Sequence, residues 1–162
     1  MRKLCATAAL ALTLATSPAW AKDIVQTARD AKIFGTLLTA ARLAGLLDDL
    51  KTAGPFTVFA PTDDAFRRLP AGTVEALIHP GNRKKLAAII AYHVVPGRIL
   101  AAQVPTTPTD VETINLSDAE VRAVRRAGSV FVNGIRVQQA DIRADNGVIH
   151  VIGQVLWPGE RR

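Results

Sequence analysis

NGVIHVIGQVLWP, residues 146–158, contains the pattern that is most informative about the fold. Strict alternation assigns the strand residues to two faces: Val148, His150 and Ile152 on one, and Ile149 and Val151 on the other. Because both faces are apolar apart from one imidazole, the pattern predicts a central strand covered on both sides. A lone imidazole in such a strand is more often a hydrogen-bonded core residue than a metal ligand.

A second histidine, His93, lies in the equally apolar stretch IIAYHVVPG, residues 89–97. The helical spacing i, i+3, i+4 and i+7 is met by a set of residues that ends at this histidine: Leu86, Ile89, Ile90 and His93. Two imidazoles in apolar surroundings are compatible with a metal site, a catalytic pair or a structural core. The structural interpretation predicts that they form hydrogen bonds across a helix–sheet junction.

The chain before residue 97 is predicted to be mainly helical. The expected elements are a helical region over 23–54 that stops at Gly54-Pro55, a short buried strand over 56–60, and helices over 61–69, 72–78 and 82–93. Thr62 and Thr73 are the expected N-caps of two of these helices. Asp63 and Asp64 follow Thr62 in a first turn, where the helix dipole favours negative charge.

After Pro96-Gly97 the pattern changes to short strands separated by turns. A loop over 105–110 precedes the expected strands, which cover 111–116, 120–126, 129–134, 135–144, 147–152 and 154–158. Asn133-Gly134 is a strong hairpin signal, and Asn146-Gly147 is a second turn signal. Helices followed by a mostly antiparallel sheet predict an α+β domain.

The first 21 residues resemble a secretory signal peptide. A short basic start precedes an apolar run of less than membrane-spanning length, and Ala19-Trp20-Ala21 offers a small-x-small cleavage signal. Cleavage after Ala21 leaves residues 22–162 as a single domain with no cysteine, because Cys5 is removed. We therefore expect an exported protein, periplasmic or extracellular, that relies on a hydrophobic core and has no membrane span in its mature form.

The mature chain is moderately basic. The full sequence has 20 Lys+Arg and 14 Asp+Glu, and removal of Arg2 and Lys3 leaves 18 and 14, a net charge of +4. This charge favours anionic surfaces such as polysaccharide or acidic lipid, and it is also an ordinary charge for solubility. The run Arg83-Lys84-Lys85 is a solvated helix start that could touch an anionic partner.

The sequence contains none of the usual catalytic patterns. It has no H-E-x-x-H, no G-x-S-x-G and no Walker loop, and the spacing of His79, His93 and His150 matches no usual ligand pattern. Aromatic residues make up only 5% of the chain, which argues against a nucleic-acid-binding surface. We therefore expect no enzymatic activity, no metal and no cofactor.

Three segments together resemble the fasciclin (FAS1) domain family. They are GPFTVFAPTDDAF at 54–66, YHVVPG at 92–97 and NGVIHVIGQVLWP at 146–158, in the order and spacing of that family. The resemblance covers about Asp23 to Pro158 and implies helices packed on a twisted β-sandwich. It also implies a non-enzymatic adhesion or protein-interaction module at the cell surface or in the extracellular matrix. The alternative is a domain that binds a small apolar ligand, or an anionic polysaccharide or lipid.

The resemblance suggests four binding residues. In animal relatives an Asp-Ile pair before the last block and the region around Tyr-His are implicated in integrin-dependent adhesion, and here these positions are Tyr92, His93, Asp141 and Ile142. This chain departs from the animal pattern at Gln139-Ala140, where Glu-Pro is common, and at Gly153, where Asp or Thr is common. The expected partner is a cell-surface or matrix protein or polysaccharide, and the expected state is a monomer or weak homo-oligomer.

Overall fold

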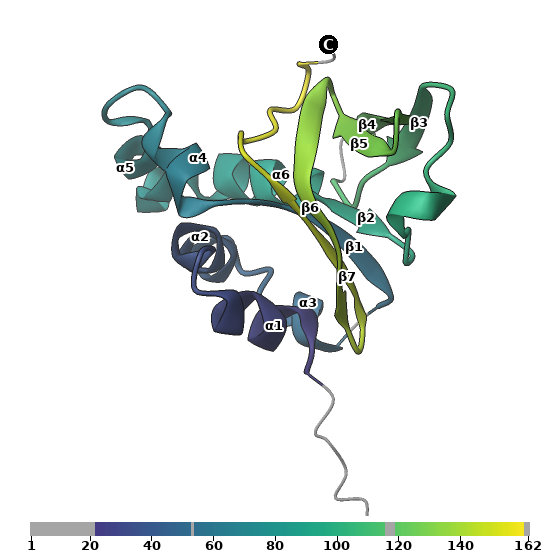
Figure 1. Ribbon diagram of the computed structural model, residues 1–162. Helices are drawn as coiled ribbons and strands as arrows, with labels where there is room; N and C mark the ends of the chain where they lie inside the picture. The colour runs from purple at the N-terminus through teal and green to yellow at the C-terminus, as the bar shows by residue number, and fades with distance from the viewer. Residues whose placement is uncertain (1–21, 53, 116–118, 161–162) are drawn as a thin grey trace, which may run out of the picture.

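The computed structural model describes residues 22–52, 54–115 and 119–160 (Figure 1). The expected signal peptide, residues 1–21, lies outside the described residues. The helices are α1 (Ile24–Ala31), α2 (Gly35–Ala44), α3 (Asp49–Thr52), α4 (Asp63–Arg67), α5 (Thr73–Ile78) and α6 (Arg83–Tyr92), with 3-10 turns η1 (Pro80–Asn82) and η2 (Ala101–Gln103). The strands are β1 (Phe56–Pro61), β2 (Val94–Pro96), β3 (Thr109–Glu112), β4 (Glu120–Arg126), β5 (Ser129–Val132), β6 (Ile135–Ala144) and β7 (Gly147–Ile152).

Within the described residues, seven strands form one sheet in the order β2-β1-β7-β6-β5-β4-β3. β1 and β7 pair in parallel, and the other neighbours pair antiparallel. The N–H of Ile114, just after β3, donates to the carbonyl of Val94 in β2 at 2.9 Å. This contact brings the two ends of the strand order together, so the sheet folds over on itself in a barrel-like way. The predicted α+β class is confirmed.

β6 is the strand at which the sheet folds over. Its first residues pair with β5, and its remaining length pairs with β7. The β6–β7 register shifts twice, between Val137 and Gln139 and again between Gln139 and Ile142. Asp141 lies in the second shift with φ 60, a left-handed conformation that bends the strand.

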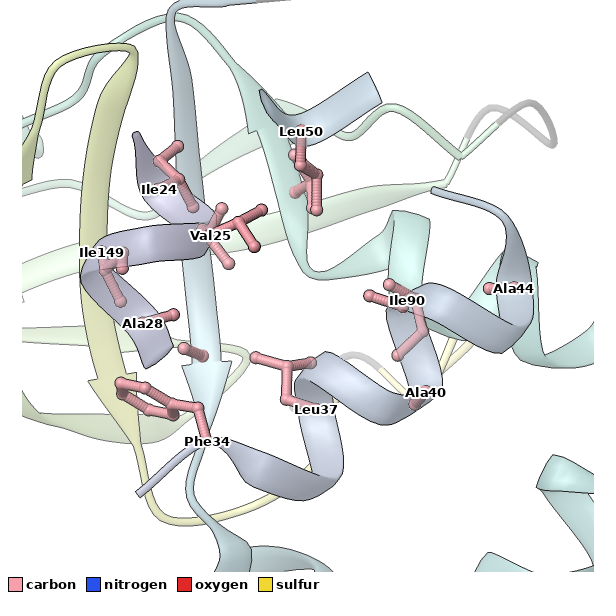
Figure 2. Close-up of a cluster of buried hydrophobic side chains, with 14 of the residues drawn as sticks. Ile24, Val25, Ala28, Phe34, Leu37, Ala40, Ala44, Leu50, Ile90 and Ile149 are labelled. Atoms are coloured by element: carbon pink, nitrogen blue, oxygen red, sulfur yellow. The ribbon is translucent and has the colours of Figure 1, made fainter. Parts of the chain in front are cut away.

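The folded sheet separates two hydrophobic cores. The inner core, enclosed by the sheet, includes Phe59, Tyr92, Val95, Val121, Val132, Ile152 and Leu156. The helix-side core lies between the sheet and the helices and includes Ile24, Val25, Phe34, Leu37, Ile90, Ile149 and Val151 (Figure 2). Because β7 contributes Ile149 to one core and Ile152 to the other, the predicted central strand with two covered faces is confirmed.

The helical region expected over 23–54 is broken into α1, α2 and α3, which the sequence pattern alone did not predict. α1 ends at Lys32 with φ 58, and α2 ends at Gly45 with φ 82. The carboxylate of Asp63 accepts from the N–H groups of Gly35 and Thr36 at 3.3 and 2.7 Å, so a residue of α4 caps the start of α2. Partial burial would raise the pKa of Asp63, but these amide donors hold it below its ordinary value.

Two further local predictions are corrected by the structure. α5 begins at Thr73 and the residue in the N-cap position is Gly72, so Thr73 is not the cap. The expected strand over 154–158 does not form. Val155 and Leu156 are nevertheless buried, because they pack into the cores from an irregular segment. The N-cap role of Thr62 is confirmed, since its side chain accepts from the N–H of Ala65.

Candidate binding surface and two buried histidines

His93 joins the end of α6 to the C-terminal segment. Its side chain is 1% exposed, and its two ring nitrogens contact main-chain groups from different parts of the chain. Nε2 accepts from the Leu156 N–H at 2.9 Å, and Nδ1 lies 2.8 Å from the Ile89 carbonyl oxygen. Because the first group can only donate and the second can only accept, the proton is on Nδ1 and the imidazole is neutral.

Burial keeps His93 neutral over most of the pH range. Removal from solvent lowers the pKa of His93 from 6.5 to about 4, and its hydrogen bond to the Ile89 carbonyl opposes this only in part. Protonation of Nε2 would also place a second donor against the Leu156 N–H. The predicted role of His93 as a hydrogen-bonded core residue is confirmed.

His150 makes the same kind of bridge with the opposite tautomer. Its Nδ1 accepts from the Asp141 N–H at 3.2 Å, and its Nε2 donates to the Ile99 carbonyl at 2.7 Å. The ring stacks on Phe59 with centroids 5.6 Å apart and an interplanar angle of 27°. Burial lowers the pKa of His150, against the hydrogen bond to Ile99 and the charge of Asp141. The imidazole therefore fixes the bend of β6 against β7.

Tyr92 is 1% exposed and has its hydroxyl group inside the inner core. The hydroxyl donates to the Glu120 carbonyl at 2.9 Å and accepts from the side-chain amide of Asn133 at 2.9 Å. Asn133, in turn, accepts from the Arg122 N–H at 2.8 Å. The hairpin signal Asn133-Gly134 therefore has a second role that we did not predict, which is to tie the β5–β6 turn to α6 and β4.

Asp141 and Ile142 lie at the second register shift of β6. Asp141 is exposed, and its Oδ1 accepts from the Ala101 N–H at 2.8 Å, while its own N–H binds His150. Ile142 is half-buried against the helix-side core. Of the four suggested binding residues, Asp141 is exposed on the surface, and Tyr92 and His93 are enclosed. The structure places Asp141 beside His150.

Gly153, where the chain departs from the animal pattern, lies next to the side chain of Gln138. A Cβ atom at this position would meet the end of the flexible, exposed Gln138 side chain, which would have to shift.

The part of the chain that the structure describes contains no group of three His, Cys, Asp or Glu side chains placed to hold a metal ion. His79 is exposed, and its Nδ1 accepts from the Gly81 N–H at 3.2 Å. In that same part of the chain, the helices are all too short or too polar to cross a bilayer.

An apolar void lies between α1, α2 and the sheet, among the side chains of Figure 2. Val25, Leu37, Ile90 and Ile149 are among the residues that line it, and its volume is about 20 Å³. Pockets that hold small ligands are larger, about 300 Å³ or more. The helices and the sheet therefore pack closely here, and this void is too small for a ligand of that size.

The model of the fasciclin domain family matches residues 32–158. The chain belongs to the fasciclin domain family. It is 49% identical to Protein sll1483 of Synechocystis sp. over 138 residues, which cover 85% of this chain and 74% of that protein. It is 35% identical to the immunogenic protein MPB70 of Mycobacterium bovis, with coverage of 76% and 63%.

Other relatives of this fasciclin domain include animal proteins. The chain is 38% identical to the transforming growth factor-beta-induced protein ig-h3 of Sus scrofa over 77% of this chain and 18% of that protein. Its fold matches a FAS1 domain pair of the insect cell adhesion molecule fasciclin I with a TM-score of 0.59 and 22% identity, over 75% of this chain and 45% of that one. These matches confirm the predicted family and fold.

Proposed function

We propose that this fasciclin domain is an exported, non-enzymatic adhesion or protein-interaction module. Family membership supports the proposal, as does the fold shared with an insect cell adhesion molecule. The observation that carries it is the setting of Asp141, an exposed carboxylate on a bend of β6 that hydrogen bonds hold on two sides. A charged group that is already held in place on an exposed strand lowers the cost of ordering side chains when a partner binds.

The buried histidines support the non-enzymatic part of the proposal. His93 and His150 each use both ring nitrogens in hydrogen bonds to main-chain groups. A general base needs a free nitrogen within reach of a substrate proton. These imidazoles are committed to the fold instead.

Export and the partner complete the proposal. Cleavage after Ala21 would release residues 22–162 to the periplasm or the cell exterior, where the domain would act as a monomer or weak homo-oligomer. The partner would be a cell-surface or matrix protein or polysaccharide that meets the exposed part of β6. Tyr92, His93 and Ile142 would act indirectly, by holding the surface around Asp141 in place.

The test is binding of residues 22–162 to intact cells and to extracted surface material, measured for three variants. Asp141→Asn removes the charge and retains an acceptor for the Ala101 N–H, and Asp141→Ala removes both. Asp145→Asn is the matched control, because it removes an equivalent exposed charge from the turn after β6. We expect both Asp141 variants to bind at least about tenfold more weakly, and the control to bind normally.

The variants separate a contact from a change in shape. An equal loss of affinity in Asp141→Asn and Asp141→Ala identifies the charge as the binding group. Loss in Asp141→Ala alone means that the shape of the bend is recognised. Saturable binding that is unchanged in all three variants would contradict a role for Asp141.

A further inference from the structure

The positive charge of the chain is concentrated in one part of the sheet. Residues 121–140 contain four arginines and no acidic residue, out of the 18 basic and 14 acidic residues of 22–162. The remaining residues of 22–162 therefore carry 14 of each sign and no net charge. This window of +4 forms most of β4, all of β5 and the start of β6, and Glu120, the first residue of β4, lies just outside it.

The strand register assigns these residues to two faces. Val121, Ala123, Val130 and Val132 point into the inner core. The cross-strand pairs Val124–Phe131, Arg126–Ser129 and Phe131–Arg136 place the opposite set on the outer face. Glu120 and its cross-strand partner Glu112 also lie on the outer face, at its far end beyond Arg122. Within residues 121–136 the outer face consists of six residues: Arg122, Val124, Arg126, Ser129, Phe131 and Arg136. We call these six residues the arginine face.

The arginine face is open to solvent. β4 and β5 pack mainly against their neighbouring strands, and α1, α2 and α3 lie toward the other side of the molecule (Figure 1). Arg126 and Arg136 are exposed. Val124 is only 7% exposed, and its cross-strand partner Phe131 is half-buried. The face therefore has a short apolar centre with cationic side chains around it.

Two arginines of this face are available to a ligand. The guanidinium of Arg122 is already bound to Asp110, through Nε to Oδ1 at 2.9 Å and through Nη2 to Oδ2 at 3.1 Å. This partner raises the pKa of Arg122. Arg126 and Arg136 have no acidic side chain within salt-bridge distance among the described residues. Arg136 is the cross-strand partner of Phe131 in β6, and Arg126 follows Val124 by two residues along β4.

We propose that the arginine face binds an anionic polysaccharide, with Arg126 and Arg136 pairing carboxylates of the sugar chain and Phe131 contacting a sugar ring. Guanidinium groups bind carboxylates through two parallel hydrogen bonds. One face of a pyranose ring carries mainly C–H groups, and the half-buried ring of Phe131 offers a flat apolar surface for it. This site is separate from Asp141 and does not rest on the function proposed for it.

The geometry favours a polysaccharide over other polyanions. A single-stranded nucleic acid is held by several aromatic rings, and this face has one. A membrane surface is bound by exposed apolar side chains that insert, and the apolar residues here are buried or half-buried. A sugar chain needs one flat ring and spaced cations, which β4, β5 and β6 provide.

The test is the affinity of residues 22–162 for polygalacturonate, with dextran as the neutral control polymer, at low and high salt. In the double variant Arg126→Gln/Arg136→Gln we expect the affinity to fall at least about tenfold. Lys84→Gln/Lys85→Gln is the matched control, because it removes the same charge from the exposed start of α6. Phe131→Leu retains the cover over Val124 and removes the aromatic ring, and we expect a loss of several-fold.

Each result decides the proposal. The proposal is supported if NMR amide chemical shifts change in β4, β5 and β6 when polygalacturonate is added, and if affinity falls in Arg126→Gln/Arg136→Gln but not in Lys84→Gln/Lys85→Gln. Equal loss in the two double variants would mean diffuse charge attraction and would overturn it. Dextran bound as tightly as polygalacturonate would also overturn it. So would binding to anionic vesicles or to DNA in a protein that does not bind polygalacturonate. Failure here leaves the Asp141 result untouched, since Asp141 variants retain the arginine face.

Discussion

Replacement of His93 by alanine should strongly destabilise the fold. The substitution removes the partner of the Leu156 N–H and of the Ile89 carbonyl, and both groups lie in the interior. The His93 N–H bonds to Ile90, so the Ile89 carbonyl has no helical donor from residue 93. Both main-chain groups would be left unpaired at the junction of α6 with the C-terminal segment.

The expected magnitude follows from these two groups. Each unpaired buried group costs about 1–3 kcal/mol, and alanine also leaves a space where the ring was. We expect the free energy of unfolding to fall by about 4 kcal/mol, out of a typical total of about 5–15 kcal/mol. For a domain of this size the midpoint of thermal unfolding should fall by roughly 10 °C.

Chemical and thermal denaturation of three variants provides the measurement. His93→Ala removes the ring and its hydrogen bonds, and His93→Phe fills the space but leaves the two groups unpaired. His79→Ala is the control, since that histidine is exposed and bonds only to the nearby Gly81 N–H. We expect His93→Phe to lose about 3 kcal/mol and the control to lose less than about 0.5 kcal/mol.

His93→Phe decides between packing and hydrogen bonding. If filling the space restores the stability of the unmodified protein, the histidine contributes volume, and the argument from unpaired main-chain groups is wrong.

Three other changes test separate parts of the fold. The folded-state pKa of His93 is about 4, against 6.5 when unfolded, so the unfolded chain binds more protons between these values. Denaturation at a series of pH values should show that the contribution of His93 to the free energy of unfolding is complete above pH 6.5 and falls by about 3 kcal/mol toward pH 4. His150 should act in the same direction, because burial also lowers its pKa. In His93→Phe the free energy of unfolding should depend less steeply on pH. Asp63→Ala removes the acceptor for two amides at the start of α2 and should cost about 1 kcal/mol by urea denaturation, more than Asp64→Ala. Gly147→Ala places a methyl group against a β1 carbonyl and should cost about 2 kcal/mol or more in the same assay; unchanged stability would mean that β1 and β7 can separate easily.

Sequence reasoning succeeded where the deciding residues are neighbours in the chain. The alternation in β7 predicts two covered faces because every second residue shares a face, and Asn133-Gly134 predicts a tight turn because both residues tolerate positive φ. In the structure these two residues have φ 48 and 79 and connect β5 directly to β6.

It failed where the deciding partner is distant in sequence. The break between α1 and α2 is stabilised by Asp63, which lies 28 residues beyond Gly35. The segment after β7 does not form a strand, and its Leu156 N–H instead donates to His93, 63 residues away. Periodicity carries no information about such contacts. The burial of the histidines was therefore predictable, but the groups that they bind were not.

The polar residues of the family segments bind main-chain groups in places where regular pairing stops. Tyr92 binds the β4 carbonyl of Glu120, His93 binds an irregular segment after β7, and His150 binds a bend of β6 and the Ile99 carbonyl in the loop after β2. A buried main-chain group without a partner is costly, so each of these side chains stabilises an irregular feature of the backbone. One such feature is the bend that presents Asp141. Arg126 and Arg136 on the outer face of β4–β6 take no part in these contacts, so we expect substitutions there to test binding without unfolding the domain.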